Sequence, residues 1–138
     1  MGMPKTQIMV GIPTFGHSWV LQNPARWQVA SMATGPGRRG GGYVSFPEVC
    51  SLLQSGAKRE YDNESKVPFL HKGKLWISYD DMDSVARKAA WIRSNGYGGT
   101  MTFSLGTDDW TGKCGYGTFP LQNAIAYPKN DNRSEQFY

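Results

Sequence analysis

The sequence has 138 residues, of which 39% are hydrophobic, 19% are charged and 13% are aromatic, and its formal net charge is +4. This composition predicts one domain with an apolar core and argues against intrinsic disorder except at the ends of the chain. The basic residues are scattered rather than arranged in a stripe, and no apolar run is long enough to span a bilayer, so we expect neither nucleic acid nor a membrane as partner.

The first third of the chain combines one strand, one irregular segment and one helix. Gln7 to Pro13, QIMVGIP, is an almost unbroken apolar run that predicts a fully buried strand of the parallel-sheet kind. Thr14 to Gly42 is rich in Gly and Pro, and we interpret it as turns, since TGPGRRGGG lacks the pattern of a phosphate loop. FPEVCSLLQSG then predicts a helix with one apolar face that ends at Gly56.

The rest of the chain predicts strands and helices with clear boundaries. Three short strands are expected, the last two joined as a β-hairpin: Lys58–Tyr61, Val67–His71 and Leu75–Tyr79. DDMDSVARKAAWIRSNG predicts the longest helix, because aspartates precede it and Gly96 follows it as a stop signal. A strand over Gly98–Leu105 and a helix over Pro120–Ala126 follow, and we expect residues 128–138 to form a frayed polar tail.

The order of these elements indicates the fold class. With the middle segment set aside, it is strand, helix, strand, helix, which favours an α/β fold with parallel strands and a right-handed crossover. Two parallel strands cannot by themselves close a sheet that is buried on both faces. We therefore expect the chain to be part of a larger structure. The first residues do not resemble a signal peptide, which fits either an intracellular protein or a piece of a longer secreted one.

Two pairs of adjacent acids could be catalytic or structural. Asp80 and Asp81 stand where the longest helix begins, which favours a capping role. Asp108 and Asp109 follow the last predicted strand, and strand ends are where α/β enzymes place catalytic groups. Adjacent side chains diverge, however, whereas hydrolysis by two carboxylates needs them to face each other. We interpret the second pair as residues that fix a loop, by capping or by pairing with Lys113.

Other catalytic and binding signals are sparse, apart from the aromatics. The only histidines, His17 and His71, form no metal-binding motif, and no CxxC or G-x-S-x-G occurs, so we predict no metal and no cofactor. Cys50 and Cys114 could pair, but the composition leaves this open. Eight aromatic residues could either stack on sugar rings or fill the core: Phe15, Trp19, Trp27, Tyr43, Trp76, Tyr79, Phe103 and Trp110.

Four segments together resemble the C-terminal part of family 18 chitinases and chitinase-like lectins. They are IMVGIPTFGHSW, TGPG followed by GGYVSFPEVC, KVPFLHKGKLWISYDDMDSVARKAAWIRSNGYGGTMTFSL, and DDWTGKCGYGTFPLQNAI. The resemblance implies the C-terminal piece of a (β/α)8 TIM barrel that carries an α+β insertion subdomain. Residues 1–15 would hold barrel strand seven and residues 16–80 the insertion subdomain. Residues 81–127 would hold a barrel helix, strand eight and the closing helix, followed by the tail at 128–138.

The same resemblance implies a substrate groove and a disulfide. The implied substrate-binding residues are Phe15, His17, Tyr43, Met101 and Phe103. Phe103 falls where the family has a Trp beneath the cleavage subsite, Phe15 and His17 fall where many members have Tyr and Arg, and Gly40 falls where many have a groove-facing Glu. These departures remove a hydroxyl, a permanent charge and a carboxylate, while Phe103 can still stack without an indole N–H. Cys50 and Cys114 match a family disulfide, which indicates an oxidising, extracellular compartment.

The resemblance also limits the activity that we expect. Family 18 enzymes carry a D-x-x-D-x-D-x-E motif whose Glu is the general acid, while the substrate's N-acetyl group is the nucleophile. No such motif occurs in this sequence, so no catalytic residue is assigned and we expect no hydrolysis by this chain alone. The implied function is that of a secreted chitinase segment, which would hydrolyse β-1,4-N-acetylglucosamine polymers only together with the remainder of the parent barrel. The alternatives are a non-catalytic lectin segment that binds chitin or chito-oligosaccharide, and a truncated product without activity.

Overall fold

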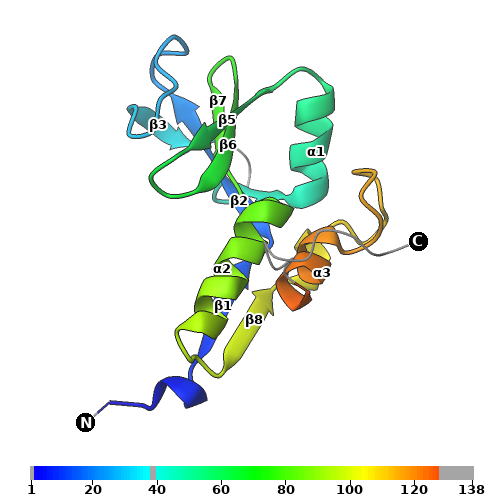
Figure 1. Ribbon diagram of the computed structural model, residues 1–138. Coiled ribbons are helices and arrows are strands. Elements are labelled where there is room, and N and C mark those ends of the chain that lie inside the picture. Colours follow the sequence, from blue (N-terminus) through cyan, green and yellow to red (C-terminus); the bar gives the residue numbers. More distant parts are fainter. Residues whose placement is uncertain (1, 38–39, 128–138) are drawn as a thin grey trace.

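The computed structural model describes residues 2–37 and 40–127 (Figure 1). A 3-10 turn at Lys5–Gln7 precedes the first strand, and another at Leu105–Thr107 follows the last one. The strands are β1 (Met9–Pro13), β2 (Phe15–Leu21), β3 (Ala33–Pro36), β4 (Tyr43–Ser45), β5 (Lys58–Asp62), β6 (Val67–Lys72), β7 (Leu75–Ser78) and β8 (Gly99–Phe103). The helices are α1 (Phe46–Gln54), α2 (Met82–Ser94) and α3 (Pro120–Ala126).

The first and last strands form a parallel pair. β1 runs beside β8 in a register that joins Met9 to Gly99 and Pro13 to Phe103. One face of this pair packs on α2, with Ile12 almost fully buried, and α2 in turn contacts α3 (Figure 1). The opposite face exposes Met9 and Phe103, because no described segment covers it. The expectation that the first strand is fully buried is therefore wrong for this chain.

The other strands form an antiparallel sheet in the order β3-β2-β7-β6-β5, with β4 also paired to β2. Helix α1 packs near β4 and β2 on one face of this sheet. A single apolar cluster runs from that face into the layer between the parallel strands and their helices: Ile12, Val44, Phe46, Val49, Cys50, Leu70, Ile77, Tyr79, Val85, Ala89, Ile92, Leu121 and Ile125. This shared core fixes the antiparallel sheet to the parallel pair.

Most predicted elements are confirmed, within a residue or two at their ends. The hairpin strands, both long helices and the closing helix all lie where the sequence places them. The interpretation of Thr14 to Gly42 as turns is wrong, since β2 and β3 lie within it. Its Gly and Pro residues lower local strand propensity, but pairing with β7 and β4 forms the strand. The predicted tail at 128–138 lies outside the described residues.

Candidate functional site

An aromatic cluster lies where β2, β4 and β8 meet. The ring of Phe15 lies 5.0 Å from that of Tyr43 and 6.3 Å, edge to face, from that of Phe103. The ring of His17 lies 4.5 Å from that of Tyr43 and 5.7 Å from that of Phe15. We call these four residues, Phe15, His17, Tyr43 and Phe103, the aromatic platform. Tyr43 is 56% and Phe103 is 62% exposed, so the platform offers large apolar faces to solvent.

Strand pairing explains how residues far apart in the sequence reach one surface. Phe15 and His17 are alternate residues of β2 and therefore point to the same face of the sheet. Tyr43 lies directly opposite His17 in the β2–β4 ladder. Phe103 joins them because its carbonyl oxygen accepts a 3.0 Å hydrogen bond from the N–H of Thr14, one residue before β2.

The glycines before β4 serve this pairing rather than any phosphate. Gly42 has a φ of +89°, and a Cβ at this position would lie 2.8 Å from the carbonyl oxygen of Ser18. The carbonyl oxygen of Gly42 accepts hydrogen bonds from both the N–H (2.7 Å) and the hydroxyl (2.9 Å) of Ser18. Only glycine combines this conformation with so close an approach. The glycines thus bring Tyr43 against His17.

Met101 extends the exposed apolar face along β8. It is two residues before Phe103, so both side chains point to the same side of the parallel pair. Met101 is 48% exposed, and its Cε would lie 3.4 Å from a Cβ added at Gly11, its partner in the register. All five residues predicted to bind substrate therefore lie on strands whose exposed faces are neighbours.

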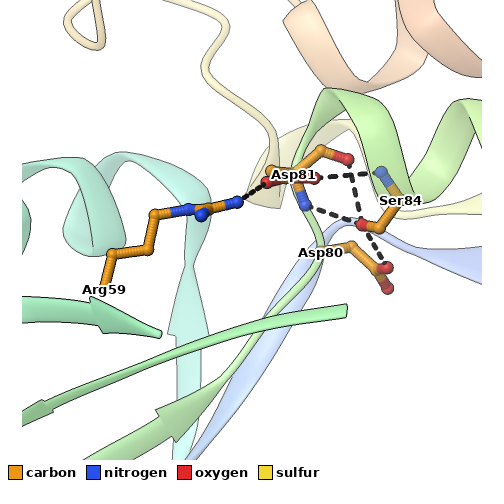
Figure 2. A network of polar contacts seen from close by, with 4 residues as sticks. All are labelled: Arg59, Asp80, Asp81 and Ser84. Carbon is orange, nitrogen blue, oxygen red and sulfur yellow. Dashed lines mark hydrogen bonds and ion pairs between the residues drawn. The ribbon is translucent and has the colours of Figure 1, made fainter. Parts of the chain in front are cut away.

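The acids at the start of α2 are structural (Figure 2). The carboxylate of Asp81 accepts a 2.9 Å hydrogen bond from the N–H of Ser84. In return, the N–H of Asp81 donates a 2.9 Å hydrogen bond to the hydroxyl oxygen of Ser84. Arg59 contacts Asp81 at 2.7 Å, and Asp80 accepts from Ser84 at 2.7 Å and from Lys88 at 2.6 Å. Each carboxylate is occupied by a cap or a cation, which confirms the capping interpretation.

The second acid pair also holds the backbone. Asp108 is fully buried and accepts hydrogen bonds from the N–H groups of Asp109, Leu121 and Gln122, the last two in the first turn of α3. Asp109 accepts from the N–H groups of Lys113 and Cys114 at 3.1 and 2.7 Å. The structure therefore agrees with the loop-fixing interpretation, although Lys113 contributes its backbone rather than its ammonium group.

Two opposing effects act on Asp109. Burial raises the pKa of Asp109, but hydrogen bonds from Cys114, Lys113 and the hydroxyl of Thr111 outweigh it and hold the pKa below the ordinary value of 3.8. The carboxylate is thus charged near neutral pH and acts as an acceptor. A carboxyl group with a lowered pKa is poorly suited to donate a proton as a general acid.

A disulfide links helix α1 to the loop before α3. Cys50, in α1, is bonded to Cys114, which lies 64 positions later in the sequence, and their Cα atoms are 5.5 Å apart. The bond confirms the pairing that the resemblance implies. It ties α1 to the same loop that Asp109 holds, so both fix the segment that follows β8.

The remaining aromatics divide between core and surface. Tyr79 is 6% exposed and belongs to the core, where burial raises its pKa to about 12. Trp76 packs against Phe69 with the ring centroids 5.3 Å apart, whereas Trp19 beside it is 42% exposed. Trp19 lies outside the predicted substrate-binding residues, although it shares one face of β2 with Phe15 and His17. The alternation of Phe15, His17 and Trp19 in that segment is the signal that could have found it.

Neither a metal centre nor a membrane span is found in the part of the chain that the structure describes. Among residues 2–37 and 40–127, no group of three or more His, Cys, Asp or Glu side chains could hold a metal ion. In the same residues, no helix is long and apolar enough to cross a membrane. The surface that the geometry does offer is the exposed aromatic platform.

Comparison with known proteins agrees with this geometry. Residues 1–108 match the family model of the glycosyl hydrolases family 18. The chain is 37% identical to an endochitinase from Brugia malayi over 131 residues, and 38% identical to chitinase-3-like protein 2 from Homo sapiens over 130 residues. The fold and the sequence thus define a glycosyl hydrolase-like α/β protein, and the chain belongs to family 18.

Solved structures give the same result. A chitinase from Trichuris suis superposes with a TM-score of 0.86 at 38% identity over 91% of this chain. Human YKL-39, described as a pseudo-chitinase with retained chitooligosaccharide binding, superposes with a TM-score of 0.85 at 37% identity, also over 91%. The chain covers 36% and 35% of these structures, and 26% and 33% of the two relatives named above.

Proposed function

We propose that the chain forms one wall and part of the floor of a groove that binds chito-oligosaccharides. In this proposal β1 and β8 are strands seven and eight of a (β/α)8 barrel, residues 16–80 are the insertion subdomain, and residues 81–127 complete the barrel segment. The parallel pairing of β1 with β8 and the helices on one face of that pair support this assignment. The whole barrel would include strands from outside this sequence.

The aromatic platform is the observation that carries the proposal. Pyranose rings present apolar C–H faces that stack on aromatic rings, while their hydroxyls need polar groups at the edges. Phe103 and Phe15 supply the faces, and the imidazole of His17 and the hydroxyl of Tyr43 supply polar atoms beside them. Met101 would line the floor next to Phe103, at the carboxyl end of β8, where parallel α/β barrels bind their substrates.

Binding without turnover is the activity proposed for this chain. The D-x-x-D-x-D-x-E motif that carries the general acid of the family does not occur in the sequence, and both acid pairs are engaged in structural hydrogen bonds. A binding role for the whole protein, as in a chitinase-like lectin, is the second candidate. It is favoured by the likeness to a pseudo-chitinase with retained chitooligosaccharide binding. The Cys50–Cys114 disulfide supports a secreted protein in either case.

Calorimetric titration of chitohexaose into the chain tests the proposal. Burying one aromatic face contributes about 1.5 kcal/mol, so Phe103→Ala should weaken binding by about tenfold. Trp91→Ala is a matched control, because Trp91 is 56% exposed but lies on α2 against Tyr97, away from the platform. Equal affinities for the Phe103→Ala and Trp91→Ala variants would contradict the proposed floor.

Turnover needs a separate measurement. The chain should release no fluorophore from a fluorogenic chitobiose substrate, because it lacks the general acid. Release that exceeds the rate of the Phe103→Ala variant would show that this chain contains a catalytic group, and would overturn the assignment of Asp108 and Asp109 to structure.

A further inference from the structure

We propose that a pocket beside Trp19 and Trp76 is an additional sugar-binding site, which takes one N-acetylhexosamine ring of a chain lying on the aromatic platform. The pocket encloses about 190 Å³ between these two rings, the end of β2 and the loop from residue 22 to residue 32. We call it the tip pocket. The inference rests on the proposed function and extends it to a surface outside the predicted substrate-binding residues.

The tip pocket continues the surface that carries the platform. Phe15, His17 and Trp19 are alternate residues of β2, so their side chains share one face of the sheet. At about 3.3 Å per residue, the Cα atoms of Phe15 and Trp19 lie roughly 13 Å apart along the strand. Trp76 lies directly opposite Trp19 in the β2–β7 ladder and points to the same side. One face of the antiparallel sheet therefore presents aromatic rings from Phe15, which contacts Phe103 of β8, to Trp76.

The wall of the tip pocket is fixed before any ligand binds. The indole N–H of Trp76 donates a 3.0 Å hydrogen bond to the carbonyl oxygen of Trp27. Trp27 itself stacks on His71, with ring centroids 4.6 Å apart and planes within 4°. Phe69 packs against the same group, with its ring centroid 5.3 Å from that of Trp76. The loop is thus anchored over the sheet beside Trp19, and little ordering remains to oppose binding.

Trp19 is the ring that this arrangement leaves open. Trp27 and Trp76 are partly buried by their packing, whereas 42% of the surface of Trp19 is accessible. An exposed indole next to a preformed wall contributes little to folding, but it provides a large flat face for a ligand. Tryptophan is the side chain that gains most from such stacking, because its ring buries the largest area.

The polar groups of the tip pocket select a neutral ligand. Its lining includes the amide of Gln28 and the hydroxyl of Ser31, and no charged side chain. Within the described residues, neither side chain forms a hydrogen bond, so both can donate to and accept from a ligand. A charged ligand group buried there would have no oppositely charged side chain beside it, so the free energy needed to desolvate it would not be offset. An uncharged sugar, with C–H faces for Trp19 and hydroxyl or acetamido groups for Gln28 and Ser31, matches both features.

Ligand length separates the tip pocket from the platform. Chitobiose should occupy only the platform, whereas chitohexaose should reach both sites. We therefore expect Trp19→Ala to weaken chitohexaose binding roughly fivefold and to leave chitobiose binding unchanged. Phe103→Ala should weaken the binding of both sugars, whereas Trp91→Ala should leave the binding of both unchanged. Gln28→Ala should weaken chitohexaose binding and leave chitobiose binding unchanged. Because Gln28 is exposed, its replacement should not disturb folding, so this variant tests the pocket even if Trp19→Ala does not fold.

The outcomes distinguish this inference from the function on which it rests. If Phe103→Ala weakens chitohexaose binding while Trp19→Ala and Gln28→Ala do not, the proposed groove is supported and the proposed sugar site in the tip pocket is wrong. If the unaltered chain binds no chitohexaose, the proposed function fails first. If Trp19→Ala abolishes capture of a proline-rich peptide but leaves chitohexaose binding intact, the pocket serves a peptide, and the sugar site is overturned.

Discussion

Replacing Asp108 with alanine should destabilise the chain strongly, because its carboxylate is the acceptor for three backbone donors. The N–H groups of Asp109, Gln122 and Leu121 donate to it at 2.8, 2.9 and 3.3 Å. The first turn of a helix has no partners of its own for such N–H groups, so α3 depends on this side chain. The alternative role, as half of a catalytic pair, would make the carboxylate dispensable for folding.

The expected loss follows from these contacts. An unpaired buried donor costs about 1 to 3 kcal/mol, and a value near the lower limit for each of three donors gives about 3 kcal/mol in total. A domain of this size is stable by about 5 to 15 kcal/mol, so the variant should still fold. Asp108→Asn keeps one acceptor oxygen and loses the charge, and we expect roughly half of the effect.

Urea unfolding followed by tryptophan fluorescence measures the difference. With a slope of roughly 1.5 kcal/mol per molar urea, a loss of about 3 kcal/mol lowers the midpoint by about 2 M. Glu64→Ala is the control, since Glu64 lies exposed in the turn between β5 and β6, and it should change stability by less than about 0.5 kcal/mol. If the midpoint of Asp108→Ala matches that of Glu64→Ala, Asp108 does not hold α3 and the structural interpretation is wrong.

Two further predictions concern the same loop. The Cys50–Cys114 bond closes a 64-residue separation, so its reduction should cost about 4 kcal/mol in the chain-entropy description, seen as a lower urea midpoint in dithiothreitol. Two alkylatable thiols in the folded, non-reduced chain would contradict the bond. Because the folded-state pKa of Asp109 is lowered, its contribution to stability is complete above about pH 4 and is lost as the pH falls through the folded pKa. Asp109→Asn should therefore flatten the decline of stability in acid, and an unchanged pH profile would argue against this role.

The helices could be predicted from the sequence because their signals are local. Asp81 caps α2 through Ser84, three residues later, and the N–H of Ser45 donates to Glu48 at the start of α1. Such contacts span one helical turn, so the residues that define each boundary are neighbours in the sequence. Gly96, with a φ of +72°, likewise ends α2 where the sequence indicates.

The strand β2 could not be predicted in the same way because its stability comes from distant partners. It pairs with β4 and with β7, whose residues lie more than twenty positions away. Its own residues include Gly16, where a Cβ would lie 2.5 Å from the carbonyl oxygen of Ser78, so glycine here reflects close strand approach rather than a turn. A glycine read in isolation favours a turn, and only the ladder shows why it belongs to a strand.

In the candidate site, too, the identity of the residues could be predicted from the sequence but their contacts could not. The resemblance to a family selects Phe15, His17, Tyr43, Met101 and Phe103 one by one, but it gives no reason for them to touch. The ring contacts from Phe103 through Phe15 to Tyr43 and His17 follow from strand register, which the sequence does not reveal. Trp19 belongs to the same surface as His17 because both are on one face of β2, and the resemblance does not select it.

The exposed face of the parallel pair carries the strongest argument for a ligand at the platform rather than for packing alone. Met9 and Phe103 lie on the same face, at opposite ends of the β1–β8 ladder, and are 56% and 62% exposed. In a closed barrel the amino end of this face would meet other strands and be covered, whereas ligands bind at the carboxyl end. Of these two residues, Phe103 is the one with a ring contact to the antiparallel sheet, through Phe15. Completing the proposed barrel would therefore bury Met9, but it would leave Phe103 open to the sugar.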